Sequence, residues 1–226
     1  MHPHSPLARD NAWSDQYQVS HAVMAGIVSG TDHMHALKTL VVDAQKLHWA
    51  APASLVRGCL ENMATAFWIL HPRSRSERVT RTLQWYMQNA KDQHKAIYPL
   101  GITDYKPQDQ RVAKILAVAE KHPGLDVKAV KGGYFSTAVV TYADGLADPG
   151  GLGVLFPWQL CSGFAHGRPW APLSFSEREE RETDSPNVVG IRFTSDMTRV
   201  LYLVMAAMNL TQAVLRTYQE RARPLY

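Results

Sequence analysis

The segment 161–170 holds the residues of this chain that are best placed for proton transfer. Ser162 and His166 are four residues apart, a spacing that puts two side chains on the same face of a helix. The histidine could act as a general base or acid, because imidazole exchanges protons near neutral pH. The alternative is a structural histidine, hydrogen-bonded near the end of a helix that Gly167 terminates. Both interpretations remain open from the sequence.

A second polar pair interrupts an otherwise apolar helical segment over residues 52–70. Arg57 and Glu61 are also four residues apart, so they can form an ion pair on one helix face. The guanidinium of Arg57 suits recognition of a phosphate or a carboxylate, and Glu61 could orient it or take part in catalysis. The alternative is an internal salt bridge that joins two helices.

Arginines and tryptophans supply the remaining candidate ligand-binding residues. Arg81, in a basic cluster at the start of the helix after residue 72, and Arg168 could contact phosphate, although such clusters are usually solvated. Three indole rings could line a pocket, although rings of this kind are more often part of a core. These residues are Trp68, Trp158 and Trp170.

Motifs for metals and common cofactors are missing from the sequence. His33 and His35 are two apart, which is the wrong spacing for one helix face, and no acidic cluster completes a metal site. Gly151-Leu152-Gly153 lacks the strand, the helix and the GK[ST] residues of a nucleotide-binding loop. We therefore expect neither a metal nor a cofactor.

Composition is ordinary for a globular protein: 226 residues, 46% hydrophobic, 19% charged, with a net charge of +4. This charge permits an anionic partner without requiring one. Both cysteines lie in apolar helical settings, which favours reduced thiols and a cytoplasmic protein. The longest apolar run, residues 200–208, is shorter than the roughly 20 residues of a membrane span, so we expect no membrane association.

Hydrophobic periodicity of three and four residues predicts an all-α protein, an irregular multi-helix bundle. We expect a flexible tail at 1–12 and a single helical domain at 13–226. The last helix, capped by Thr194 or Ser195 and ending near Arg221, is apolar on nearly every face and is predicted to lie at the centre of the bundle. The charged stretch 174–186 is predicted to be a solvated loop or a short surface helix, with 188–193 extended.

Two passages, 55–68 and 162–170, resemble a group of uncharacterised actinobacterial helical proteins that is distantly similar to the HEPN superfamily. The resemblance implies a dimer and an association with RNA, since many HEPN-like proteins are endonucleases with an arginine four to six residues before a histidine. His166 matches that histidine, but Leu160, Cys161 and Ser162 stand where the arginine is expected. The nuclease pair of the family is therefore incomplete in this chain.

Three functions follow as alternatives. The first is a HEPN-like homodimer associated with RNA or another phosphate-bearing ligand. Its phosphate contacts would come from Arg57, Arg81 and Arg168, and His166 would act if it cleaves RNA. The second is an enzyme or binding protein for a small anionic or aromatic molecule, held between helices by Arg57, Glu61 and His166. The third is a non-catalytic helical interaction module. The sequence does not decide whether the protein is an enzyme.

Overall fold

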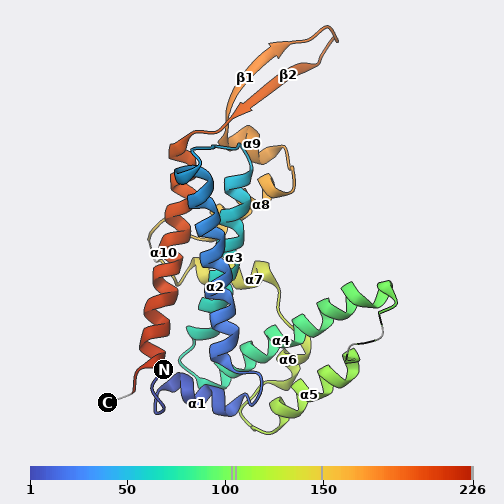
Figure 1. Ribbon diagram of the computed structural model, residues 1–226, viewed down its shortest axis with the longest axis vertical. Coiled ribbons are helices and arrows are strands. Elements are labelled where there is room, and N and C mark those ends of the chain that lie inside the picture. Colours follow the sequence, from blue (N-terminus) through green and yellow to red (C-terminus); the bar gives the residue numbers. More distant parts are fainter. Residues whose placement is uncertain (103, 105, 149, 225–226) are drawn as a thin grey trace.

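The computed structural model describes residues 1–102, 104, 106–148 and 150–224, and within them the chain is mainly helical, which confirms the predicted all-α class (Figure 1). The elements in chain order are α1 Pro6–Trp13, α2 Val19–Lys38, η1 Thr39–Asp43, α3 Ala51–Leu70, α4 Arg75–Ile97, η2 Tyr98–Leu100, α5 Gln108–Glu120, α6 Val127–Gly132, α7 Ser136–Asp144, α8 Leu155–Ala165, α9 Trp170–Phe175, β1 Glu177–Glu182, β2 Val189–Thr194 and α10 Met197–Ala222.

Helix α3 lies at the centre of the bundle. It packs against α2, α4, α7, α8 and α10, and twelve of its 20 residues are buried. Pro52 occupies its first turn, where the missing N–H costs no hydrogen bond. The long C-terminal helix α10 is present as predicted, but it packs against α3 from one side and is not itself central. The apolar residues on its outer face explain why the sequence suggested a central position.

Capping residues define where two of the long helices begin. The Ser74 hydroxyl accepts a hydrogen bond from the Glu77 N–H at the start of α4. Helix α10 is capped by Asp196, whose carboxylate accepts from the Arg199 N–H at 2.9 Å, and not by Thr194 or Ser195. Thr194 is the last residue of β2, and Ser195 lies between that strand and the Asp196 cap.

The N-terminal segment differs from the flexible tail predicted for residues 1–12. Ser5 caps α1, and Leu7 and Asp10 on that helix are fully buried. The His2 N–H also donates to the Ala222 carbonyl, so the two ends of the described chain lie close together (Figure 1). The prediction was wrong because the partners that fix this segment lie on distant helices.

Residues 177–194 form a β-hairpin, where the sequence suggested a loop or a short helix followed by an extended stretch. Strands β1 and β2 pair antiparallel, from Glu177 opposite Thr194 to Glu182 opposite Val189. The hairpin projects beyond the end of the bundle (Figure 1), and every residue of β1 is exposed. A strand exposed on both faces can carry glutamates and arginines on either side, so the charge run has no apolar alternation to indicate a strand.

Helix α10 is long and apolar enough to cross a membrane by length and composition, with 39% of its most apolar window buried. That combination is weak evidence for a membrane span, because a core helix of a soluble protein passes the same test.

Candidate functional site

The two predicted pairs form one cluster, which joins α3 to α8. The Arg57 Nε donates to the Ser162 hydroxyl at 2.9 Å, and its Nη2 lies 3.0 Å from Glu61 Oε2. The Trp158 indole N–H donates to the same Glu61 oxygen at 3.3 Å, and the Arg57 guanidinium lies 5.8 Å from the Trp158 ring centroid. Residues about a hundred positions apart in sequence therefore hold the Arg57 side chain in one orientation.

A groove of about 490 Å³ lies on the other side of this cluster, between α2, α3, α4 and the segment before α7. Its volume is in the range of small-molecule sites. The Arg57 and Glu61 side chains are 30% and 25% exposed, so both remain accessible to a ligand. The main polar and aromatic lining residues are Ser29, His33, Arg57, Glu61, Asn62, Trp85 and Tyr134.

One edge of the Arg57 guanidinium is available to a ligand. Nε and Nη2 are engaged by Ser162 and Glu61, whereas Nη1 has no hydrogen-bond partner among the described residues. A guanidinium has five N–H donors, so this edge can still bind an anion with charge-assisted hydrogen bonds. The contact with Ser162 of α8 thus orients Arg57, and the N–H donors that remain unused are on the groove side.

His33 enters the groove from α2. Its Nδ1 lies 2.7 Å from the Ser29 carbonyl oxygen. Because a carbonyl can only accept, Nδ1 carries the proton, and Nε2 of the neutral ring is left with a lone pair. The ring is half-buried against the backbone of α3 at Gly58. His33 therefore presents a hydrogen-bond acceptor in the same groove as Arg57.

Gly58 makes this arrangement of α2 and α3 possible. A Cβ at residue 58 would overlap the Cδ2 and Nε2 atoms of the His33 ring. On the facing helix, a Cβ at Gly26 would lie 2.9 Å from the Asn62 carbonyl oxygen. Glycine at these two positions lets the helices approach closely enough for an α2 histidine to lie beside the α3 pair.

His166 lies outside the cluster that contains Ser162. Its backbone N–H donates to the Ser162 carbonyl at 3.0 Å at the end of α8, and Gly167 follows with a φ of 60°. The His166 side chain is exposed, as are Arg168 and Trp170. Among the described residues, no hydrogen bond or ion pair joins the His166 side chain to Ser162 or Arg57. The four-residue spacing predicted that Ser162 and His166 share one helix face, but α8 ends at Ala165, so His166 lies just beyond the helix.

Arg81 and Trp68 form a separate cluster toward the end of α3. Arg81 Nη1 donates to the Trp68 carbonyl at 2.6 Å, and Nη2 pairs with Glu77 at 2.5 Å. The guanidinium also lies 5.1 Å from the Trp68 ring centroid and 4.2 Å from that of Tyr142. With 11% of its side chain exposed, Arg81 is committed to these contacts and presents little charge to a phosphate.

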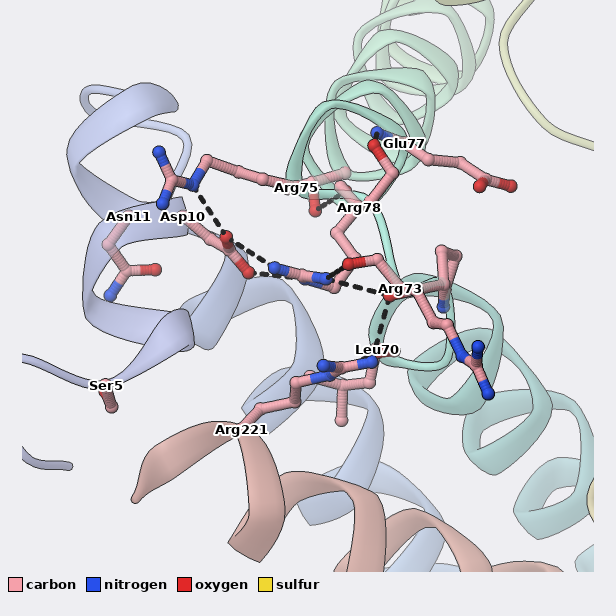
Figure 2. A network of polar contacts seen from close by, with 12 residues as sticks. Ser5, Asp10, Asn11, Leu70, Arg73, Arg75, Glu77, Arg78 and Arg221 are labelled. Atoms are coloured by element: carbon pink, nitrogen blue, oxygen red, sulfur yellow. Dashed lines mark hydrogen bonds and ion pairs between the residues drawn. The ribbon is translucent and has the colours of Figure 1, made fainter. Parts of the chain in front are cut away.

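Two further arginines near the start of α4, Arg78 and Arg221, bind groups of the protein itself (Figure 2). Arg78 makes two hydrogen bonds to the Asp10 carboxylate, at 2.6 and 2.9 Å, and its Nη1 donates to the Pro72 and Arg73 carbonyls. Arg221 of α10 donates to the carbonyls of Leu70, His71 and Pro72. These arginines satisfy carbonyls at the C-terminal end of α3, which favours the structural interpretation of the basic cluster.

Neither cysteine is suited to nucleophilic chemistry. Cys59 and Cys161 are free and buried, and burial raises the thiol pKa to about 11 for Cys59 and to about 12 for Cys161. The thiolate is the nucleophilic form, so both residues are unreactive at neutral pH. Proton-transfer chemistry at the groove would therefore depend on His33 and Glu61.

The chain matches no protein-family model, no curated protein and no solved structure.

Proposed function

We propose that the protein binds a small organic carboxylate in the groove between α2 and α3. The observation that carries this proposal is the half-exposed Arg57 guanidinium, held by Ser162 and Glu61, with unused donors on the groove side. The carboxylate of the ligand accepts from Arg57, and its apolar part, aromatic or otherwise flat, lies against Trp85 and Tyr134.

The charge of the groove favours a small ligand over a polyanion. Arg57 is already paired with Glu61, so the two together add no net charge. Affinity for a nucleic acid depends on several uncompensated cations that neutralise phosphates. A single directional anchor in a concave site of this volume instead suits one carboxylate group.

His33 gives the site a group that can receive a proton. Its Nε2 lone pair accepts a hydrogen bond from a hydroxyl, an amide or an acidic C–H of the bound ligand. This is the role that the sequence suggested for His166, transferred to a histidine on another helix. Whether binding leads to catalysis then depends on the acidity of the ligand group that faces Nε2.

Benzoate is the simplest probe of this proposal, because it has only a carboxylate and a flat ring. Isothermal titration calorimetry should show saturable binding to the wild-type protein with a Kd on the order of 1 mM. Arg57→Gln should weaken binding at least tenfold, because it removes a charge-assisted hydrogen bond of about 1.5–3 kcal/mol. His33→Asn should bind benzoate almost as the wild type does, because benzoate offers no donor to Nε2.

Arg199→Gln is the matched control. Arg199 is 32% exposed and pairs with Asp196 three residues away, close to the exposure and spacing of Arg57, but it lies at the start of α10. Benzoate should bind this variant as it binds the wild type. The proposal would be contradicted if benzoate showed no saturable binding to the wild type, or if both arginine variants lost the same affinity for benzoate.

Association with RNA, which the family resemblance implies, is a second proposal, and a different hollow supports it. Lys106, Arg111 and Lys114 line a hollow of about 460 Å³ beside Tyr17 and Tyr86, whose ring centroids are 5.0 Å apart. Within the described residues none of these three cations forms an ion pair. Basic side chains next to aromatic rings suit single-stranded nucleic acid.

A labelled single-stranded RNA tests this second proposal by fluorescence anisotropy. Binding should weaken as salt rises and should be lost in the double variant Arg111→Glu/Lys114→Glu. The His166→Ala variant shows, in the same assay, whether RNA binding depends on the predicted catalytic histidine. No binding at low salt would leave the carboxylate groove as the only proposed site.

A further inference from the structure

Helix α10 has a second apolar face that no other described segment of the chain covers. Its inner face packs against α3 through buried residues such as Leu203, Ala207 and Leu210. Its outer face exposes large apolar side chains by 41 to 52%. These outer residues, which we call the α10 stripe, are Met197, Leu201, Met205, Met208 and Leu215.

The spacing of the stripe is that of a coiled-coil seam. From Leu201 the positions advance by four, three and seven residues, so they keep to the a and d positions of a heptad. Gln212 occupies the skipped a position and is exposed. The buried residues of α10 fall at b, c and f, on the opposite side of the helix. Such a repeat needs a second helix as its partner.

We propose that the α10 stripe is the dimer interface of this protein, with the α10 helix of a second copy as its partner. A twofold interface must be self-complementary, and a heptad seam on a single helix meets that condition with its own copy. Three of its five residues are methionines, whose flexible side chains adapt to one another at an interface. This proposal is independent of the carboxylate site.

The surface is large enough for a stable dimer. The α10 stripe runs from Met197 to Leu215, which is about 27 Å at 1.5 Å per residue. The stripe continues into an apolar groove of about 220 Å³ between α10, α2 and η1, where Met34, Val41 and Val42 lie beside Leu201. A strip of that length and about two helix diameters wide covers on the order of 600 Å² of each copy, at the lower end of the range for specific interfaces.

A second copy fits the stripe better than a lipid bilayer does. Gln212 interrupts the apolar surface at its middle, and Arg216, Gln219 and Glu220 follow toward the C-terminal end. All four are exposed, so a spanning helix would place an amide or a charge against lipid on every turn of its second half. In a coiled coil, a polar residue at one a position fixes the register of the two helices.

Analytical ultracentrifugation of the full chain tests this proposal. The wild type should sediment as a dimer at micromolar concentration, and Leu201→Glu/Met208→Glu should raise the dimer dissociation constant at least 100-fold, which is about 2.7 kcal/mol. Phe156→Glu on α8, at a residue that is 52% exposed, is the matched control and should remain dimeric. Circular dichroism shows whether each variant is folded.

Leu215→Lys at the far end of the stripe gives a second test if the double variant does not fold, and it should also weaken the dimer. A monomeric wild type at about 100 µM, well above the Kd of a standard interface, would overturn the proposal. So would a dimer that survives both stripe variants, or a wild-type monomer that binds phosphatidylcholine vesicles through the stripe.

Discussion

The Asp10–Arg78 pair and the Arg57–Glu61 pair join the same two functional groups in two different settings. Asp10 and Arg78 have side chains that are 0% and 4% exposed, whereas those of Arg57 and Glu61 are 30% and 25% exposed. Every guanidinium nitrogen of Arg78 has a partner, and Arg57 keeps Nη1 without one among the described residues. The first pair lies within the protein (Figure 2), and the second lines a groove.

The difference shows how a structural arginine can be told from a ligand-binding one. A buried guanidinium is tolerated only when its donors are all satisfied, so it has nothing left to offer a ligand. A half-exposed guanidinium that is oriented on one side and unsatisfied on the other has already lost part of its conformational freedom before a ligand arrives. The number of unused donors therefore says more about function than the charge does.

The largest effect should come from breaking the buried pair. Arg78→Met leaves the buried Asp10 carboxylate with only the more distant Arg75, whose Nε lies 3.6 Å away, and should lower the free energy of unfolding by about 3–5 kcal/mol. Urea denaturation followed by circular dichroism measures this change. Adding Asp10→Asn should recover only part of the loss, since the Pro72 and Arg73 carbonyls still lack a donor. A loss below 1 kcal/mol for Arg78→Met would contradict the structural role.

Breaking the exposed pair should cost much less. Arg57→Gln should lower the free energy of unfolding by about 1 kcal/mol or less, because water solvates the remaining Glu61 carboxylate. The same denaturation experiment compares it directly with Arg78→Met. If the two variants lose equal stability, the distinction between the pairs is wrong.

Changing the pH should affect the region around the buried pair. Burial, and then the charges of Arg81 and Arg221, lower the pKa of His71 from its ordinary value of 6.5. The unfolded chain therefore takes up this proton more readily, and stability should fall as the pH drops below about 6.5. His71→Gln should flatten this part of the curve of unfolding free energy against pH. An unchanged slope would contradict the assignment.

The smallest effect on stability is expected at Gly58. Alanine favours a helix by about 1 kcal/mol over glycine, but its Cβ would displace the His33 ring. These effects oppose each other, so Gly58→Ala should change the unfolding free energy little. The histidine ring should nevertheless move, which the imidazole resonances of an NMR spectrum would report. Unchanged resonances would show that the ring does not depend on Gly58.

Local patterns were enough to predict the helices that surround the site. The apolar spacing over 52–70 predicted α3, and the Arg57–Glu61 pair followed from its spacing alone. Ser162 was also identified, but its partner is Arg57, 105 residues away, and not His166. Residue spacing predicts which side chains are neighbours on one helix, but it does not predict which helices pack against each other.

The features that the sequence did not predict depend on contacts between distant segments. His33 was considered only as a metal ligand, because its place beside Gly58 depends on how α2 packs against α3. The buried N-terminal helix depends on Arg78, 68 residues after Asp10. A glycine on α3 opposite a histidine on α2 is the one signal that could have suggested this part of the groove.

Arginine side-chain NMR tests most directly whether Arg57 binds a carboxylate and Arg78 does not. The Nε–Hε resonances of the wild-type protein would be recorded during a benzoate titration, with Arg57→Gln used to assign the Arg57 signal. We expect a saturable shift of the Arg57 resonance, whereas the Arg78 resonance should not shift. Benzoate binding that leaves the Arg57 resonance unmoved, or that shifts Arg78 instead, would contradict this expectation.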